Sequence, residues 1–325
     1  MRAMKIILAP MEGLADFWVR QALTDIGGYD WCVTEFVRVS GTLLPPKVFY
    51  RWCPELASNA RTRGGTPVHV QLLGSDPACM ADNAARAVEL GAPAIDLNFG
   101  CPAKTVNRHG GGAVLLDEPE RVYQVVAAVR RAVPQAIPVS AKMRLGNLDG
   151  ELALDNARGI QAAGAAWLTV HGRTKSQGYR PPAFWDQIGL IREAISLPVI
   201  ANGEIWNCED ARRCMRESGC DAMMLGRGAV SDPFLARRLR GDLLDHGWPE
   251  VRASDTRRPQ GRELHCRTQG LFQLCLKTQT CLAQAGPAPP PDNGWLESSH
   301  DLQRGMRMRE TPMDSLPADL IDALL

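Results

Sequence analysis

The chain has 325 residues, of which 45% are hydrophobic and 22% are charged, and its net charge is +1. This composition is that of an ordinary globular protein and excludes the fibrous and disordered extremes. The length allows one domain of about 250 residues with a smaller appendage. Because the net charge supplies no general attraction to nucleic acid, RNA binding would need a local patch of Lys and Arg.

The ten cysteines are scattered along the chain and lack the dense spacing of a secreted disulfide scaffold. The apolar run before Glu12 is too short for a secretory signal, and no stretch of 18 apolar residues occurs. We therefore expect a cytoplasmic protein without a membrane segment. Cys208, Cys214 and Cys220 lack the C-x-x-C spacing of zinc sites, so we expect buried thiols there and no metal.

Short apolar runs rich in Val, Ile and Leu alternate with helical patterns as far as about residue 240. This alternation predicts repeated β-α units around a parallel sheet. Eight units favour a TIM (β/α)8 barrel of the α/β class over an open doubly wound sheet, because no G-x-G-x-x-G turn follows the first strand. The expected strands are Ile6–Pro10, Trp31–Glu35, Pro67–Leu72, Ala94–Asn98, Val139–Met143, Trp167–His171, Pro198–Asn202 and Ala222–Gly226.

Helix signals lie between these strands. Asp76 and Pro77 are typical of a helix start, and Gly91 is typical of the residue after a helix end. A second helix is expected over residues 118–133, where valines recur at three- and four-residue spacing on one face. These valines are Val122, Val125, Val126, Val129 and Val133.

Polar residues stand at the end of every expected strand. One such residue is more often structural than functional, but eight concurrent cases indicate an active site, because barrel enzymes carry theirs at this end of the strands. The residues are Met11, Glu12, Glu35, Gln71, Asn98, Cys101, Lys142, Arg144, His171, Arg173, Asn202, Gly203, Glu204, Gly226, Arg227 and Gly228.

Two features of this rim indicate a ligand. Glycines after the seventh and eighth strands, together with Arg227, favour binding of a phosphate group. Lys142 ends an apolar strand, where its charge is costly unless it meets an anion or a polarised ring. Position alone leaves two interpretations of Lys142 open: a Schiff-base lysine, or a cation beside the electron-rich edge of a reduced flavin.

Several short motifs lie at or after the ends of the expected strands. They are Ala9-Pro10-Met11-Glu12-Gly13, Asp96-Leu97-Asn98-Phe99-Gly100-Cys101-Pro102, Gly110-Gly111-Gly112-Ala113, Lys142-Met143-Arg144, His171-Gly172-Arg173-Thr174, Asn202-Gly203-Glu204-Ile205 and Gly226-Arg227-Gly228. In these motifs the chain resembles the tRNA-dihydrouridine synthases over roughly residues 4–240, and the N-x-G-C-P turn at residues 98–102 is the most specific of them. Residues 34–38 and 177–180 most resemble the branch that modifies uridine 16 of the tRNA D-loop, the DusC branch.

The resemblance implies an enzyme with FMN across the barrel mouth and NADPH as hydride source. A flavin hydride would pass to C6 of a uracil while Cys101 protonates C5. A thiol suits this acid role because its ordinary pKa of about 8.5 keeps it protonated at neutral pH. The alternative, non-catalytic interpretation is that Cys101 is a buried structural thiol in a turn. The FMN contacts implied are Pro10, Met11, Glu12, Gln71, Lys142, His171, Asn202, Gly203, Glu204, Gly226 and Arg227.

The same resemblance implies a tRNA substrate. Asn98 would orient the uracil edge, and basic or aromatic rim residues would contact the RNA backbone or stack on it, because the uridine must leave its own stack to react. The substrate-binding candidates are Glu35, Asn98, Arg144, Arg173, Lys175 and Tyr179. A monomer is expected.

The end of the chain departs from the family pattern. We expect residues 1–240 to form the catalytic barrel and 241–325 a smaller, helical tRNA-recognition region, yet the basic helix of relatives is not found there. Two explanations of this departure are open: a divergent or partly disordered RNA-binding tail, and a disturbed reading frame in the gene. Two rival functions are an FMN barrel acting on a small metabolite, as dihydroorotate dehydrogenases do, and an inactive tRNA-binding relative.

Overall fold

The computed structural model describes residues 4–108 and 110–241. Strands and helices alternate along this part of the chain. The strands are β1 (Lys5–Leu8), β2 (Trp31–Val33), β3 (Val37–Arg38), β4 (Val68–Leu73), β5 (Ile95–Phe99), β6 (Val139–Arg144), β7 (Leu168–His171), β8 (Val199–Asn202) and β9 (Ala222–Leu225). The α-helices are α1 (Phe17–Ile26), α2 (Pro46–Trp52), α3 (Pro77–Glu89), α4 (Lys104–Asn107), α5 (Pro119–Ala132), α6 (Ala153–Ala162), α7 (Trp185–Ala194), α8 (Cys208–Ser218), α9 (Arg227–Ser231) and α10 (Leu235–Arg240), with 3-10 turns η1 (Pro54–Ser58) and η2 (Gly112–Asp117).

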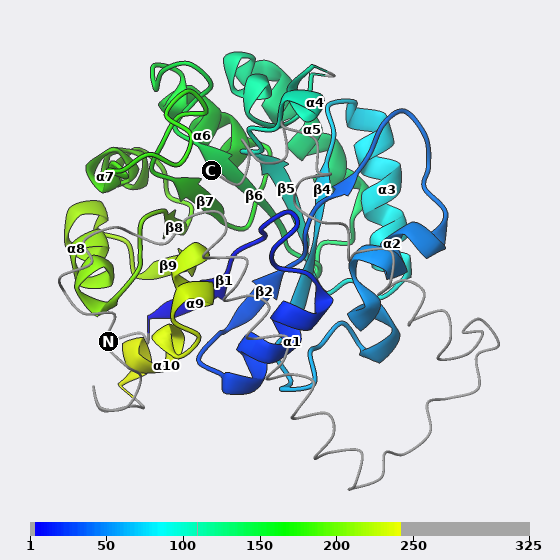
Figure 1. Cartoon of the computed structure of the whole chain (residues 1–325). Coiled ribbons are helices and arrows are strands. Elements are labelled where there is room, and N and C mark those ends of the chain that lie inside the picture. The colour runs from blue at the N-terminus through cyan, green and yellow to red at the C-terminus, as the bar shows by residue number, and fades with distance from the viewer. Residues whose placement is uncertain (1–3, 109, 242–325) are drawn as a thin grey trace, which may run out of the picture.

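The strands close into a barrel (Figure 1). β2 pairs with both β1 and β4, each strand from β4 onward pairs with the next, and β9 pairs with β1. The pairings are parallel, and helices surround the ring. The TIM barrel predicted from the sequence is confirmed. Among the described residues, none of the helices has the length and apolar character needed to cross a membrane.

The second expected strand is interrupted, which the sequence did not indicate. β2 ends at Val33 and β3 begins at Val37, and both pair with β4. Val33 pairs with His69 and Val37 pairs with Leu72. Between these two pairs, the β2–β3 segment advances by four residues and β4 by three. The additional residue is a bulge, a device that bends a strand and redirects a side chain. Glu35 lies in this bulge.

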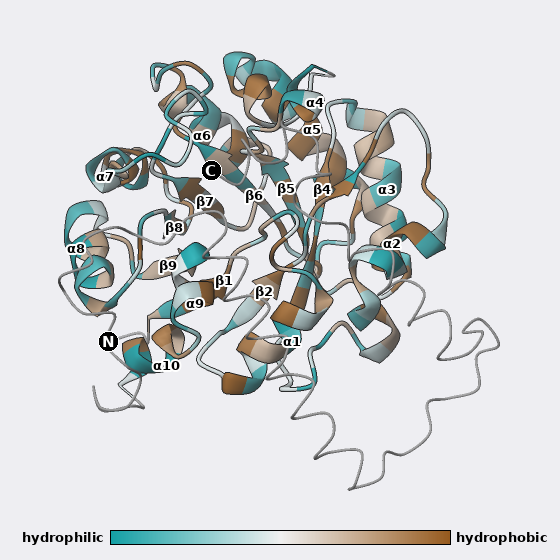
Figure 2. Ribbon diagram, in the orientation of Figure 1, coloured by the Kyte–Doolittle hydropathy of each residue, from teal (hydrophilic) through white to brown (hydrophobic). Residues whose placement is uncertain are grey.

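Alternate residues of a strand face opposite sides of the barrel wall. On β1, Ile6 and Leu8 pack in the large core between the strands and the helices, whereas Ile7 belongs to a second, smaller cluster. Because this second cluster joins residues of β1, β2, β8 and β9, it lies inside the barrel. Figure 2 shows hydrophobic residues on the strands and hydrophilic ones on the outer helix surfaces. The inner cluster is Ile7, Ala9, Val33, Ile200, Ala222 and Met224.

The opposite half of the barrel interior is polar. On β5, Leu97 and Phe99 pack with the helices, so Asp96 and Asn98 face inward. The same alternation on β4 and β6 turns further polar side chains toward the axis. They are His69, Gln71, Ser140, Lys142 and Arg144. The polar half of the interior leads directly to the carboxyl ends of the strands.

The helices that the sequence predicted form as expected. The Asp76 side chain caps α3 by accepting a hydrogen bond from the backbone N–H of Cys79 at 2.7 Å. Gly91, which follows the end of α3, has a φ of 96°, a value that favours glycine. α5 buries the valine face at Val122, Val125, Val126 and Val129. The expected C-terminal region begins at the last described residue, Gly241, so the division into domains stays a prediction.

Candidate active site

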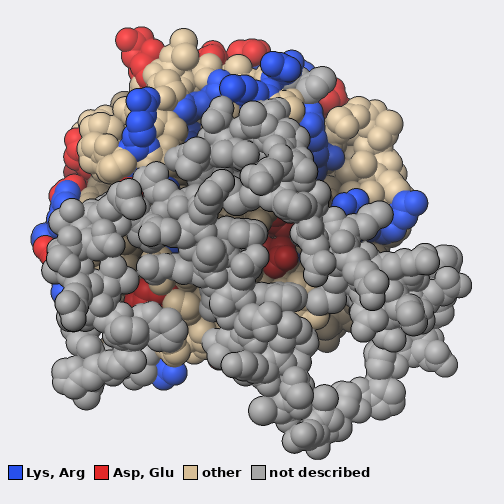
Figure 3. All heavy atoms as spheres, viewed as in Figure 1, with Lys and Arg blue, Asp and Glu red and all other residues tan. Residues whose placement is uncertain are grey.

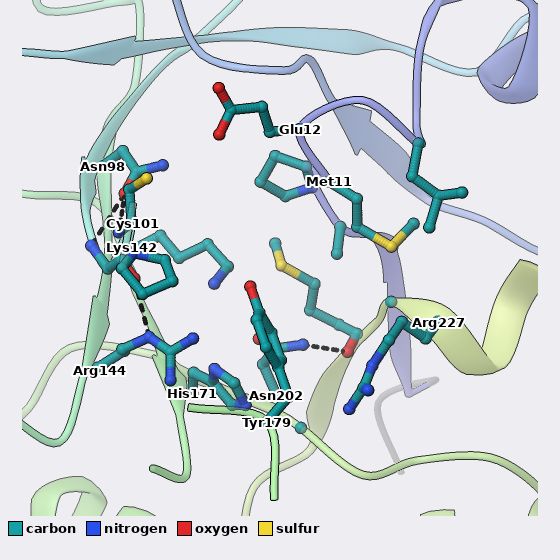
Figure 4. A pocket seen from close by; sticks show the side chains of 18 of the residues that line it. Met11, Glu12, Asn98, Cys101, Lys142, Arg144, His171, Tyr179, Asn202 and Arg227 are labelled. Atoms are coloured by element: carbon teal, nitrogen blue, oxygen red, sulfur yellow. Dashed lines mark hydrogen bonds between the residues drawn. The ribbon is translucent and has the colours of Figure 1, made fainter. Parts of the chain in front are cut away.

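A pocket opens at the carboxyl ends of the barrel strands (Figure 4). Asn98, Cys101 and Lys142 stand on one side of it and Arg227 on the opposite side. The lining residues are Ala9, Pro10, Met11, Glu12, Leu14, Glu35, Phe36, Gln71, Asn98, Gly100, Cys101, Pro102, Lys142, Arg144, His171, Tyr179, Asn202, Gly203, Glu204, Ile205, Trp206, Met224, Gly226, Arg227 and Gly228.

The Cys101 turn is held by the side chain of Asn98. The Asn98 Oδ1 atom accepts hydrogen bonds from the backbone N–H groups of Gly100 at 2.9 Å and Cys101 at 3.0 Å. The Cys101 carbonyl accepts from Asn107 Nδ2 at 3.0 Å, which ties the turn to α4. Burial raises the pKa of the Cys101 thiol to about 11. At neutral pH this thiol is therefore protonated, which suits a proton donor better than a nucleophile.

Positive charge surrounds His171 at the polar side of the pocket. Burial lowers the pKa of His171 well below its ordinary value, and the neighbouring cations lower it further, so the imidazole is neutral at pH 7. Burial also lowers the pKa of Lys142 to about 8, with Arg144 adding to the effect. Burial lowers the pKa of Arg173 and that of Arg227 to about 10 each. Four cations thus share one confined region.

The Glu204 carboxylate pairs with two of these four cations. Glu204 contacts Arg173 Nη2 at 2.7 Å and Arg227 Nη2 at 3.1 Å. Glu204 also has a left-handed φ of 56°, a conformation that costs free energy in residues other than glycine. Among the described residues, the Lys142 ammonium donates no hydrogen bond, and its side chain points into the pocket (Figure 4). The pocket, which Glu12 and Glu35 also line, therefore presents an ammonium group that is free to bind a ligand.

Tyr179 lies between two guanidinium groups. The Arg144 guanidinium is 5.1 Å from the ring centroid of Tyr179, and that of Arg227 is 5.0 Å from it. Arg144 in turn donates to the carbonyl of Gly100 at 2.8 Å, next to Cys101. These cation–π contacts connect the Cys101 side of the pocket with the Arg227 side.

The glycines at the β8 and β9 corner are explained by close packing of the chain. A Cβ atom on Gly228 would lie 2.0 Å from the carbonyl oxygen of Ile205. Gly203 has a φ of 114°, and a Cβ there would lie 2.7 Å from the His171 ring. Glycine is thus required at positions 203 and 228 whether or not a ligand binds, which weakens the sequence argument that these two indicate a phosphate. At Gly226 a Cβ would meet no atom nearer than 3.6 Å, so packing does not explain that glycine.

Most residues predicted from the sequence meet in this pocket. Sixteen of the eighteen line it, and the exceptions are Arg173 and Lys175. Arg173 is fully buried behind the wall, and Lys175 donates to Asn147 Oδ1 at 3.2 Å outside the pocket. Sequence reasoning missed the lining residues Phe36, Trp206 and Met224. Met224 stands two positions before Gly226, so strand alternation could have indicated it.

Comparisons with known proteins agree with this architecture. The dihydrouridine synthase family model matches residues 7–269. A tRNA-dihydrouridine(16) synthase of Cupriavidus necator is 53% identical over 84% of this chain and 87% of its own length. One of Escherichia coli strain K12 is 55% identical over 76% of this chain and 79% of its own length.

The chain belongs to the dihydrouridine synthase family. The family and the class of enzyme expected from the sequence motifs are confirmed. Solved structures show the same barrel at low identity. A 2-naphthoyl-CoA reductase has a TM-score of 0.56 at 12% identity, and covers 73% of this chain and 50% of that protein. A histamine dehydrogenase from Rhizobium sp. 4-9 has a TM-score of 0.54 at 15% identity, over 74% and 46%.

Proposed function

We propose that this dihydrouridine synthase reduces a D-loop uridine of tRNA, uridine 16, to 5,6-dihydrouridine with FMN and NADPH. The names of the relatives at 53% and 55% identity support the tRNA substrate and the target position. The observation that carries the chemistry is the buried Cys101 thiol, which faces the pocket and is protonated at neutral pH.

The pocket suits FMN because the ligand carries a phosphate and an electron-rich ring. The cations around His171 provide attraction for both. Lys142, which has no hydrogen-bond partner among the described residues, would gain one from the ligand. When bound and reduced by NADPH, FMN supplies the hydride for C6 of the uracil. The residues that would hold FMN are Pro10, Met11, Glu12, Gln71, Lys142, His171, Asn202, Gly203, Glu204, Gly226 and Arg227.

The protein's own part in the chemistry is the second half of the reduction. Cys101 Sγ holds a proton and donates it to C5 of the uracil, because burial keeps this thiol un-ionised. Asn98 sets the Cys101 backbone and faces the same space. Arg144, which donates to the Gly100 carbonyl beside Cys101 and lines the pocket, would contact the reacting nucleotide.

Binding of tRNA requires surface beyond the pocket. Among the described residues visible in Figure 3, Lys and Arg gather along the upper edge of the molecule, in the region of α4, α5 and α6. Such an edge suits a polyanion. We propose substrate contacts for Glu35, Asn98, Arg144, Lys175 and Tyr179. Arg173, which is buried behind the wall, would support the site through Glu204. Residues 1–240 would be the catalytic domain and 241–325 the tRNA-recognition region.

Mass analysis of tRNA tests this proposal. After incubation with NADPH, the wild-type protein should add two hydrogens to one D-loop uridine, and the Cys101→Ala variant should add none at the same time point. Flavin absorbance of both purified proteins is the control for cofactor binding. Unchanged tRNA with the flavin-loaded wild type would contradict the function. A product yield unaffected by Cys101→Ala would contradict the acid assignment and leave the function standing.

A further inference from the structure

A buried carboxylate lies beneath the pocket and is not part of its lining. Asp96 is on β5 and is 1% exposed. Its Oδ2 atom accepts a hydrogen bond from Gln71 Nε2 at 2.7 Å, and its Oδ1 atom accepts one from Ser140 Oγ at 2.6 Å. Burial of an ionised carboxylate costs free energy, so a buried aspartate with two short hydrogen bonds suggests a specific role.

The contacts of Asp96 continue upward to the reactive turn. Gln71 uses its Oε1 atom to accept from Asn98 Nδ2 at 2.8 Å. Asn98 uses its Oδ1 atom to accept from the backbone N–H groups of Gly100 and Cys101. One unbroken chain of buried hydrogen bonds therefore links Asp96, Gln71, Asn98 and Cys101. It passes from β5 to β4 at Gln71 and returns to β5 at Asn98.

Both ends of this chain of hydrogen bonds set the same direction, because the backbone N–H groups of Gly100 and Cys101 can only donate and Asp96 Oδ2 accepts. A side-chain amide can turn by 180° and exchange its donor for its acceptor. If Gln71 turned, its oxygen would face the Asp96 oxygen, and its donors would face the donors of Asn98. If Asn98 turned, its NH2 group would face the N–H of Cys101. The backbone donors exclude the turned Asn98, and an acceptor at Asp96 Oδ2 satisfies the buried Gln71 NH2 group in the one orientation that also serves Asn98.

We propose that Asp96 is a positioning residue that fixes the orientations of Gln71 and Asn98 and thereby the place of the Cys101 side chain in the pocket. This inference rests on the proposed function, in which Cys101 is the proton donor. The positioning role requires an acceptor, whereas the charge of Asp96 acts separately on Lys142, whose pKa it raises. Ser140 can act as donor or acceptor toward Oδ1, so either protonation state of Asp96 leaves Oδ2 free to accept from Gln71.

Two substitutions separate the acceptor from the charge. Asp96→Asn retains a carbonyl oxygen for Gln71 and can donate to Ser140, whereas Asp96→Leu has a similar size and no acceptor. For Asp96→Leu we expect the kcat of dihydrouridine formation to fall at least about tenfold while the KM for tRNA stays within about twofold, because misplacement of a reacting group lowers the chemical rate. Asp96→Asn should recover most of that rate.

A second readout does not depend on turnover. We expect iodoacetamide to label Cys101 at least about threefold faster in Asp96→Leu, because a released turn exposes the thiol and removes the burial that suppresses its thiolate. Peptide mass mapping distinguishes Cys101 from the other nine cysteines. Labelling of Asp96→Asn should match the wild type within about twofold if the acceptor is the requirement.

A remote variant controls for loss of stability. Asn156 on α6 is equally buried and donates to the carbonyl of Leu116 at 2.8 Å, away from the pocket. Asn156→Ala should lower the melting temperature and leave both the kcat and the Cys101 labelling rate unchanged. If Asp96→Leu yields no soluble protein, Asp96→Ala makes the same test, with a smaller expected change because water can enter the space.

The outcomes separate this inference from the proposed function. Wild-type labelling and kcat in Asp96→Leu would overturn the positioning role, and so would equal losses in Asp96→Leu and Asp96→Asn. If Cys101→Ala retains activity, the acid assignment fails. The labelling rates would still decide whether Asp96 positions Cys101, because they measure the thiol and not the reaction.

Discussion

At the scale of single residues, Lys142 is a buried cation that lowers the stability of the fold and that we assign to ligand binding. Burial lowers its pKa to about 8, so the ammonium form is disfavoured by folding. Because the ordinary pKa of lysine is about 10.4, this cost is present below pH 8 and disappears as the pH rises toward 10. An unpaired cation that destabilises the fold at neutral pH is typical of a group retained for its function.

We predict that the rate of dihydrouridine formation falls as the pH rises above the pKa of Lys142, which is about 8 without ligand and higher beside bound FMN. The Lys142 ammonium is lost there, whereas the Cys101 thiol has a pKa of about 11. Lys142→Met should be slower by at least about tenfold at pH 7 and should lack this fall. Single-turnover rates between pH 6 and 10 measure both.

Thermal melting completes the prediction for Lys142. Lys142→Met should raise the melting temperature of the ligand-free protein at pH 7, because an apolar side chain replaces an unpaired buried charge. The difference from the wild type should shrink toward pH 10. A lower melting temperature for the variant at pH 7 would show that Lys142 stabilises the fold and would remove the argument for its function.

At the scale of elements, the site depends on how closely the loops after β8 and β9 pack. Gly228, in α9, stands against the carbonyl of Ile205 in the loop that follows β8, where a Cβ would lie 2.0 Å from the oxygen. One of the two loops must therefore move if any side chain is present. That movement displaces Glu204 or Arg227, the ion pair of the pocket.

We expect Gly228→Ala to lower the free energy of unfolding by about 1–3 kcal/mol, the usual cost of overpacking, and to weaken FMN retention. The matched control is Gly159→Ala in α6, where a Cβ would meet atoms no nearer than 3.6 Å. That variant should be more stable by about 0.5–1 kcal/mol, because alanine favours the helix. Denaturant unfolding and flavin fluorescence of the filtrate measure the two effects.

At the scale of the whole molecule, the last described helix closes the barrel against its beginning. Arg240 of α10 donates to the carbonyls of Gly28 and Met4 and forms an ion pair with Asp30. Burial alone would raise the pKa of Asp30, but hydrogen bonds from Lys5, Ile6 and Arg240 outweigh it and lower the pKa of that carboxyl. This contribution to stability is present above the ordinary pKa of about 3.9 and is lost as the pH falls below it.

Arg240→Ala should therefore lower the melting temperature at pH 7, by an amount equivalent to about 1 kcal/mol, and the difference from the wild type should decrease at pH 3. Arg86→Ala serves as the control, since Arg86 pairs with Glu89 within one helix and both side chains are more exposed. Its effect should be near zero at both pH values. Equal effects of the two substitutions would contradict a role for Arg240 in closing the barrel.

The sequence by itself determined the barrel and most of the residues that line the pocket. Apolar runs repeat at β-α spacing, and parallel strands bring their carboxyl ends to one rim, so residues as distant as Pro10 and Arg227 could be placed together before any contact was known. The N-x-G-C-P turn identified Cys101 because its residues are adjacent in the chain.

The tertiary structure alone decided what surrounds those residues. Asp96 reads in the sequence as one polar residue in a buried strand, and only the register of β5 against β4 and β6 joins it to Gln71 and Ser140. Arg173 is buried behind the pocket wall, where it contacts Glu204 from a different strand end. Burial and charge neighbours depend on contacts between segments far apart in the chain, and local patterns do not contain that information.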